Sequence, residues 1–460
     1  MGWLVAVGAI VGIALALQAG LAAFAGYVVL GSYLLSRWLS RQWIENVEAQ
    51  RHCPSEPLEV GASVEVELQV RHTGRWPTLW VLAEDLFADE YLQQRPPAVQ
   101  IKGHRLQLIS LWPGQQRRWR YRLTFQRRGY YPVGPTLLES GDVFGLHRRF
   151  RIIGSPTYLL VLPRMWPLQR YDFVSRRPTG EIRLHQRLFE DPTRTAGVRE
   201  YQVGDPLSRV HWKVTARMGQ LHCRVYEPTT LAGATLLLDF HHNVYPARGE
   251  PYRSELAVTT AASVAYTLSL LKQPVGLVSN GRDAAVRIQE ESALTPSETP
   301  EEQSLGQEQD RDQLHQRFAL RQAQSHLQPV VVETRRGIDQ LIQVRETLAR
   351  LELNDGLTFA ALVSVMAPRL PRDATILAIL PHVDEGAATA LSMLRRLGFA
   401  VSVLLILPEQ IHTWQAVGRL TAAGVHDVRI ITSEADLIQG GQSVTAATGP
   451  APYSLDIPLA

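Results

Sequence analysis

Residues 199 to 228, REYQVGDPLSRVHWKVTARMGQLHCRVYEP, combine arginines, a Gly-Asp pair, a tryptophan and a closing Glu-Pro. Guanidinium groups form planar bidentate pairs with carboxylates, and a glycine permits a backbone turn that a residue with a Cβ resists. Tryptophan and tyrosine add large apolar anchors with a polar edge. The candidate binding residues are Arg199, Tyr201, Gly204, Asp205, Arg209, Trp212, Ala216, Arg217 and Glu227.

Three roles fit these residue types. They could clamp a connector and hold two domains in a fixed relation. They could form an exposed docking surface, since tryptophan and arginine are enriched among the residues that dominate interfaces. Asp205 and Glu227 could also act as an acid and base pair, although no sequence feature indicates that they converge on a cleft.

A second candidate site begins at Asp239, directly after the apolar run ATLLL. Ligands of open α/β sheets bind beyond the carboxyl ends of the strands. A von Willebrand factor type A domain begins its metal site at such a position, with Asp-x-Ser-x-Ser and a distant Thr and Asp. Here both serines are replaced by histidine and asparagine, while Thr358 and Asp384 match the distant ligands by context. This is a poor Mg²⁺ site, and the alternative is that Asp239 hydrogen-bonds the local turn. No cofactor is expected beyond this weak divalent-cation site.

Several enzyme classes lose support from the sequence. It contains no Gly-x-Ser-x-Gly elbow, no Walker phosphate loop, no Gly-x-Gly-x-x-Gly after the first α/β strand and no His-Glu-x-x-His. The formal net charge of +3 is too small to indicate a nucleic-acid partner. The two cysteines, Cys53 and Cys223, are far apart and follow no metal or redox spacing. We therefore expect a protein that is not an enzyme.

The first 36 residues are almost entirely apolar from Trp3 onward, which predicts a transmembrane segment. A straight helix of that length would exceed the hydrocarbon core, so two short spans, at 3–17 and 21–35, are predicted, with a single span as the alternative. A cleavable signal peptide is disfavoured because no basic region precedes the segment. Arg37, Arg41 and Arg51 follow it and place the remaining chain in the cytoplasm, at the inner membrane, with residues 37–54 as a juxtamembrane linker.

Residues 55–165 have the period of β-strands. Val64, Val66, Leu68 and Val70 alternate with polar residues, and the segment RWRYRLTFQRRG alternates in the same way. These patterns predict an antiparallel β-sandwich. Arg118, Arg120 and Arg122 would lie on one strand face, either as an anion-binding surface or as an ordinary solvated face.

After a connector at 166–230, apolar runs alternate with helical stretches from 231 to 437. The runs are ATLLLDF, PVGLVSN, ATILAILP and AVSVLLILP. Strands that are apolar on both faces and separated by helices predict a doubly wound parallel α/β domain. A polar insertion at 290–326 and a flexible tail at 438–460 complete the predicted domain order.

The motif at 199–228 resembles a bacterial family, domain of unknown function 58, whose hallmark is this series of arginine, Gly-Asp, arginine, tryptophan and Ala-Arg. The resemblance extends to RRGYYPVGPTLLESGDVFGL at 127–146, where Val143 stands in place of the family's proline. It implies an N-terminal membrane anchor, a sandwich and a von Willebrand factor type A-like α/β domain. It also implies a MoxR-type AAA+ ATPase partner, because relatives commonly occur beside such ATPases.

Together, these features predict a membrane-anchored cytoplasmic interaction or adaptor protein. Its expected role is in the assembly or maturation of membrane or envelope proteins, with the ATPase supplying the energy. A metal-dependent adhesin or ligand receptor is the contrasting hypothesis, and an unrecognised enzyme is a third. The basic flank after the apolar segment, the missing serines and the lack of a disulfide framework count against the adhesin.

Overall fold

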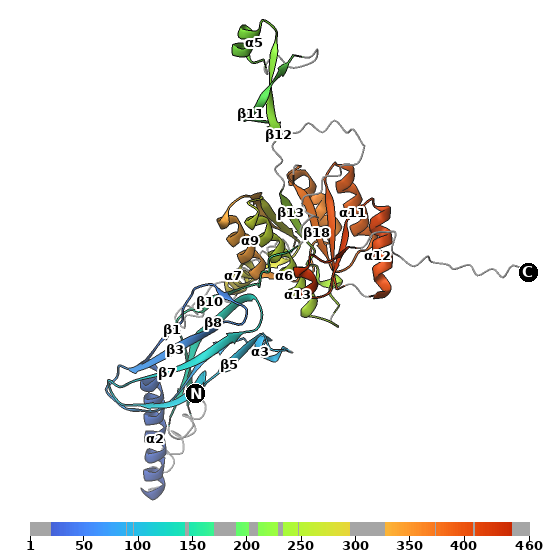
Figure 1. Cartoon of the computed structure of the whole chain (residues 1–460). Helices are drawn as coiled ribbons and strands as arrows, with labels where there is room; N and C mark the ends of the chain where they lie inside the picture. The colour runs from blue at the N-terminus through green and yellow to red at the C-terminus, as the bar shows by residue number, and fades with distance from the viewer. Residues whose placement is uncertain are drawn as a thin grey trace, which may run out of the picture. The chain divides into compact units, whose positions relative to one another are not determined.

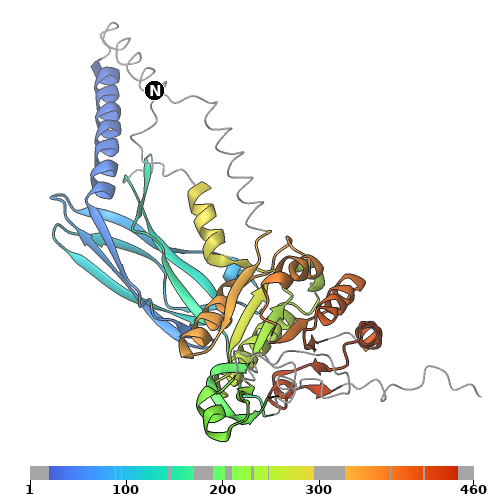
Figure 2. The same ribbon diagram turned by 90° about the horizontal axis from the view of Figure 1, so that it is seen from above.

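The structure is a computed structural model of the 460-residue chain, shown in two views in Figures 1 and 2. It describes residues 20–88, 90–94, 96–142, 147–169, 190–201, 210–228, 233–246, 248–294, 327–372, 374–407 and 410–443. The chain divides into two compact units, Met1–Pro163 and Arg164–Ala460.

Unit 1 begins with helix α2 (Gly20–Glu45), and over the residues that the structure describes it contradicts the predicted membrane-spanning segment. No helix within the described ranges is both long enough and apolar enough to cross a membrane. The predicted first span, at 3–17, lies outside the described residues. The predicted second span, at 21–35, falls inside α2, which continues through Arg37 and Arg41 to Glu45. The apolar run is thus one part of a helix whose remainder is polar and amphipathic.

The C-terminal part of α2 packs against the rest of unit 1. Ser36, Ser40, Trp43 and Ile44 are buried, with at most 5% of their surface exposed. Ser36 shares a hydrogen bond with His147 Nδ1 at 3.1 Å. This end of the helix is therefore an integral part of the fold of unit 1.

Two sheets form the body of unit 1 (Figure 1). The first has the order β1 (Val47–His52), β3 (Ser63–His72), β7 (Gln116–Phe125), β5 (Val99–Lys102), and all its pairs are antiparallel. The second has the order β2 (Leu58–Glu59), β10 (Thr157–Leu162), β8 (Gly129–Gly141), β4 (Thr78–Phe87), β6 (Leu106–Leu111), and β9 (Arg148–Ile153) also pairs with β8. A short helix, α3 (Glu90–Gln93), precedes β5.

The alternating side chains of these strands build one core. In β3, Val64, Val66, Leu68 and Val70 are buried, and Trp119, Tyr121, Leu123 and Phe125 of β7 join the same apolar cluster. On the opposite face of the two strands, Arg120 pairs with Glu67 at 2.9 Å and Arg122 pairs with Glu65 at 2.5 Å. These cross-strand ion pairs give two of the three predicted arginines, Arg120 and Arg122, a local acidic partner, as expected of a solvated strand face.

Three buried polar side chains form a hydrogen-bond network in the core of unit 1. Asp85 Oδ1 accepts a hydrogen bond from Arg51 Nη1 at 2.9 Å, and its Oδ2 accepts one from the Tyr121 hydroxyl at 2.5 Å. Burial raises the pKa of Tyr121, and the negative charge of Asp85 raises it further. Gly134 has φ +80°, a conformation that favours glycine, and a Cβ there would lie 1.4 Å from Arg51 Nη1, so glycine also leaves room for the guanidinium.

Unit 2 contains a seven-stranded sheet that is parallel at its centre and antiparallel at both edges, so the prediction of a purely parallel sheet is wrong at the edges. Its order is β16 (Val330–Arg335), β14 (Val275–Ser279), β13 (Ala234–Leu238), β18 (Thr375–Leu380), β19 (Val401–Ile406), β20 (Val428–Ile431), β21 (Gln442–Ser443). The pairs from β14 to β20 are parallel, whereas β16 and β21 pair antiparallel at the two edges. The residues that the structure describes have mixed α/β content and show no clear von Willebrand factor type A fold.

Helices pack against the apolar faces of this sheet. Leu236 and Leu238 of β13 belong to a cluster that includes α6 (Tyr252–Leu270) and α9 (Ile338–Arg350). Leu237, which points the other way, belongs to a cluster with α10 (Phe359–Met366), α11 (Glu385–Arg396) and α12 (Gln410–Ala422). The remaining elements are η2 (His242–Val244), β15 (Arg282–Asp283), α7 (Ala284–Leu294), β17 (Leu351–Glu352), η3 (Ala367–Arg369) and α13 (Glu434–Ile438).

Candidate docking surface

The motif region folds as a β-hairpin with a short helix inserted in it. Strands β11 (Glu190–Glu200) and β12 (His222–Pro228) pair antiparallel, with Arg199 opposite Cys223. Helix α5 (Trp212–Met218) lies between them in the chain. Cys223, with 1% of its surface exposed, and Val210, with 3%, are joined by a further bridge at the base of α5.

Local hydrogen bonds hold α5 to the hairpin. The Nδ1 atom of His211 accepts from the Val214 backbone N–H at 3.4 Å and caps the N-terminus of the helix. Gly219 ends the helix in the left-handed conformation, with φ +70°. His222 is bound twice, because its backbone N–H donates to the Thr215 hydroxyl at 3.1 Å and its carbonyl accepts from the His211 N–H at 2.8 Å.

The hairpin exposes large apolar side chains beside basic ones. Trp212 and Met218 each have 66% of their surface exposed. Lys213, Ala216 and Arg217 are exposed on the same helix, and no acidic residue lies in α5. We call the set Val198, Arg199, Trp212, Lys213, Arg217, Met218 and Leu221 the hairpin surface.

The structure describes part of the predicted motif. Arg199 is exposed, and its guanidinium donates to the Glu200 carbonyl at 3.1 Å. Tyr201 is half-buried, and its backbone N–H donates to the Leu221 carbonyl at 2.9 Å. Gly204, Asp205, Arg209 and the side chain of Glu227 lie outside what the structure describes, so the predicted arginine–carboxylate pairs stay predictions.

The three predicted metal ligands each make a local hydrogen bond. Thr358 Oγ1 accepts from the Ala361 N–H at the start of α10, and Asp384 Oδ1 accepts from the Ala387 N–H at the start of α11. Asp239 has 2% of its surface exposed and accepts from the His241 N–H at 3.3 Å. Throughout the described ranges, no three His, Cys, Asp or Glu side chains gather as a metal-binding group.

Asn280 is the residue that sequence analysis missed at this strand end. Its Nδ2 donates to Asp239 Oδ1 at 2.9 Å and to the Leu357 carbonyl at 2.9 Å, while its Oδ1 accepts from the Phe240 N–H at 2.6 Å. Asn354 in turn donates to the Asn280 carbonyl at 3.1 Å. The sequence offered one indication, because Asn280 directly follows the apolar run PVGLVS just as Asp239 follows ATLLL.

Burial sets the chemistry of Asp239. It raises the pKa of this carboxyl to about 6, and the charge of Asp384 contributes in the same direction. The hydrogen bonds from Asn280 and from the His241 N–H act in the opposite direction and stabilise the carboxylate. This arrangement joins three loops at the carboxyl ends of the strands, which is a structural role.

Comparison with known proteins bears on the motif. Residues 197–296 match the family model described as "Protein of unknown function DUF58". The "Uncharacterized protein YeaD" of Bacillus subtilis (strain 168) is 24% identical over 269 residues. The two matches support the resemblance of this chain to the DUF58 family. The aligned region covers 56% of this chain and 62% of YeaD, so the chain spans about three fifths of the length of that relative.

Solved structures similar to part of the chain include the CARDB domain of the PF1109 protein from Pyrococcus furiosus, in complex with di-metal ions. It is 14% identical, with 25% of this chain and 86% of that chain covered and a TM-score of 0.17. A FixG-related protein from Vibrio parahaemolyticus is 10% identical, with 25% and 96% covered and a TM-score of 0.17. With TM-scores this low, neither likeness bears on the fold or the function.

Proposed function

We propose that this chain is an interaction or adaptor protein that docks through the hairpin surface onto a MoxR-type AAA+ ATPase. The observation that carries the proposal is the 66% exposure of Trp212, the tryptophan of the motif. A tryptophan that clamped two elements together would be expected to be buried between them.

The residue types of the hairpin surface suit a protein partner. Tryptophan and arginine supply much of the binding energy at interfaces, and Trp212 and Arg217 are both exposed on α5. Because α5 is capped at both ends and bonded to β12, little conformational freedom is lost on docking. The basic side chains favour a partner surface that is apolar with an acidic rim.

The kind of partner follows from the family resemblance. Relatives of this family commonly occur beside MoxR-type ATPases, so the proposal assigns the energy-consuming step to the ATPase. This chain would present the ATPase to membrane or envelope proteins during their assembly or maturation, at the cytoplasmic side of the inner membrane.

The proposal is tested by affinity capture of the full chain in the presence of ATP. Wild type is compared with Trp212→Ala/Arg217→Ala and with the control Trp414→Ala, whose tryptophan is 50% exposed on α12. We expect a MoxR-type ATPase with wild type and control, and loss of the ATPase with the double variant.

Two outcomes contradict the proposal. If the double variant no longer unfolds cooperatively while the control does, the motif is part of the folded core of the hairpin and not a docking surface. If folded wild type captures no AAA+ ATPase, the adaptor function is wrong.

A further inference from the structure

Three exposed tryptophans from separate parts of the chain lie at one end of unit 1. Trp38 is on α2, Trp76 is in the loop between β3 and β4, and Trp112 directly follows β6. Their exposed fractions are 44%, 57% and 68%. The rings of Trp38 and Trp76 meet edge to face, with centroids 6.0 Å apart.

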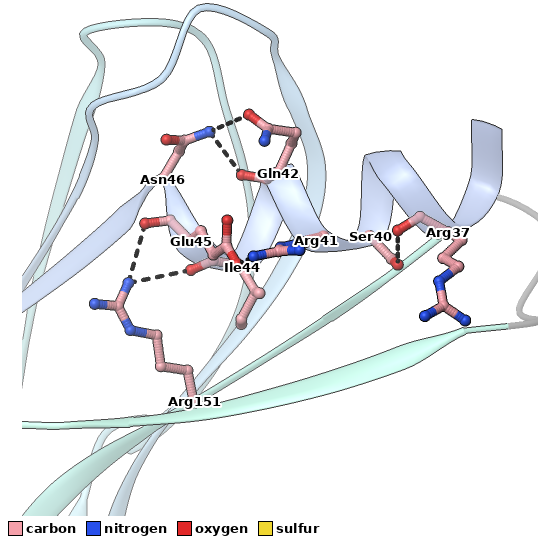
Figure 3. Close-up of polar contacts among 8 residues, drawn as sticks. All are labelled: Arg37, Ser40, Arg41, Gln42, Ile44, Glu45, Asn46 and Arg151. Atoms are coloured by element: carbon pink, nitrogen blue, oxygen red, sulfur yellow. Dashed lines mark hydrogen bonds and ion pairs between the residues drawn. The ribbon is translucent and has the colours of Figure 1, made fainter. Parts of the chain in front are cut away.

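Backbone hydrogen bonds fix the segments that carry these tryptophans. The Asn46 carbonyl, at the end of α2, accepts from the Thr73 N–H at 2.9 Å and from the Thr73 hydroxyl at 3.1 Å. His72, which ends β3 just before Thr73, accepts through its carbonyl from the Gly114 N–H at 3.2 Å, in the turn that follows Trp112. Asn46 also donates to the Gln42 carbonyl and side chain (Figure 3). The three tryptophans are therefore parts of one built surface.

Arginines accompany the tryptophans. Arg37 and Arg41 flank Trp38 on α2, and Arg75 directly precedes Trp76; all three are exposed. The nearest carboxylate on α2, Glu45, is paired with Arg41 at 2.7 Å. The acidic Glu48 of β1 stands opposite Arg71 in the register of β1 and β3. This end of unit 1 thus combines amphipathic aromatic rings with an excess of guanidinium groups.

The part of α2 that precedes Trp38 is exposed and apolar on more than one face. Phe24 is 69% exposed, Val28 51% and Val29 47%. Val29 lies about 140° around the helix from Phe24, because each residue of an α-helix turns by about 100°. Apolar side chains of a helix at a lipid interface enter the boundary between headgroups and acyl chains.

We propose that this end of unit 1, with Trp38, Trp76, Trp112, Arg37, Arg41 and Arg75, binds the surface of an anionic lipid bilayer. Tryptophan concentrates at the boundary between headgroups and acyl chains, since its ring is apolar and its indole N–H is polar. Guanidinium groups at the same depth attract anionic headgroups. The proposal is separate from docking at the hairpin surface, which belongs to unit 2.

The test is cosedimentation of the purified full chain with vesicles of phosphatidylcholine, with and without phosphatidylglycerol. Wild type is compared with Trp76→Ala/Trp112→Ala and with Trp414→Ala as the matched control. We expect the double variant to need about tenfold more lipid for half-maximal binding, because both rings leave the interface. The control should bind as wild type does.

A second variant keeps the test decisive if the tryptophan variant does not fold. Arg75→Glu changes one exposed loop residue. It should weaken binding to the phosphatidylglycerol vesicles about fivefold or more and leave binding to pure phosphatidylcholine unchanged.

Unchanged binding of folded Trp76→Ala/Trp112→Ala would overturn the proposal. So would binding of wild type that is equal with and without phosphatidylglycerol. If wild type instead self-associates without lipid, and the tryptophan variant abolishes that association, the surface binds a second copy of the chain and the lipid assignment is wrong.

Discussion

Arg151 of β9 donates from Nη1 to the backbone carbonyl of Glu45 at 3.0 Å and thereby closes the C-terminus of α2 (Figure 3). The same nitrogen lies 3.5 Å from the carbonyls of Ile44 and Val47. The last carbonyls of a helix lack intrahelical partners and carry partial negative charge, so a guanidinium there satisfies both needs. This contact joins the helix to the second sheet of unit 1.

Arg151→Ala should lower the free energy of unfolding of the chain by about 1–2 kcal/mol, since a charged donor to the carbonyls at the helix end is lost. Urea unfolding measures the change. Arg148→Ala is the matched control, because Arg148 is on the same strand but 68% exposed and 3.6 Å from Glu139. An equal effect of both variants would contradict a specific role for Arg151 at the helix end.

Arg51→Ala should destabilise unit 1 by about 3–5 kcal/mol, because it leaves the Asp85 carboxylate buried without its cation. The side chains are 8% and 0% exposed. Arg120→Ala, which removes the exposed partner of Glu67, should cost less than about 1 kcal/mol. Thermal or urea unfolding of both variants checks the difference, and similar losses would show that burial does not govern the Arg51 pair.

Asp239 gives unit 2 a pH-dependent stability. Because its pKa in the folded chain is about 6, above the ordinary value of 3.8, the folded state binds the proton more tightly than the unfolded state. The contribution of this group to stability is therefore fully present below about pH 4 and is lost, by roughly 2–3 kcal/mol, as the pH rises through about 6.

Asp239→Asn should remove this dependence, since an amide can still accept from Asn280 but does not ionise. Urea unfolding of wild type and variant at pH 4.5 and pH 7.5 measures it. We expect the variant to gain stability relative to wild type at pH 7.5. A difference between the two proteins that is equal at both pH values would refute the assignment.

Cys53 should react slowly with iodoacetamide. Burial raises the pKa of its thiol to about 11, and the nearby Arg51 only partly offsets this. At pH 8 the thiolate fraction is then about a hundredfold below that of an ordinary cysteine. The folded Ser110→Cys variant carries a second thiol at an exposed position of β6, which serves as a reference within the same chain. Timed labelling followed by mass spectrometry compares the reaction rate of Cys53 with that of this introduced thiol. Labelling of Cys53 as fast as this introduced thiol would contradict the raised pKa.

The positions and mutual directions of the central strands could be predicted from local patterns, whereas the edge strands of the unit 2 sheet could not. The alternation at 63–70 and 118–125 coincides with β3 and β7, and four apolar runs coincide with β13, β14, β18 and β19. The four runs pair parallel as predicted, because helices connect them. The edge strands β16 and β21 pair antiparallel, so the sheet is not purely parallel.

Apolar composition alone was also insufficient for α2. The run at 21–35 is typical of a membrane segment, but the structure extends the same helix to Glu45 and packs Trp43 and Ile44 into unit 1. At Asp239 the sequence indicated a hydrogen bond within the local turn but could not indicate the partner across the sheet. Its partner Asn280 is 41 residues away, and only the pairing of β13 with β14 brings the two side chains together.

The two histidines that border α5 hold their ring protons on opposite nitrogens. His211 Nδ1 accepts from the Val214 N–H, so the proton of the neutral ring is on Nε2. His222 Nδ1 lies 2.8 Å from the Gln220 carbonyl, which can only accept, so there the proton is on Nδ1. When both imidazoles are neutral, Nε2 is therefore a hydrogen-bond donor in His211 and an acceptor in His222.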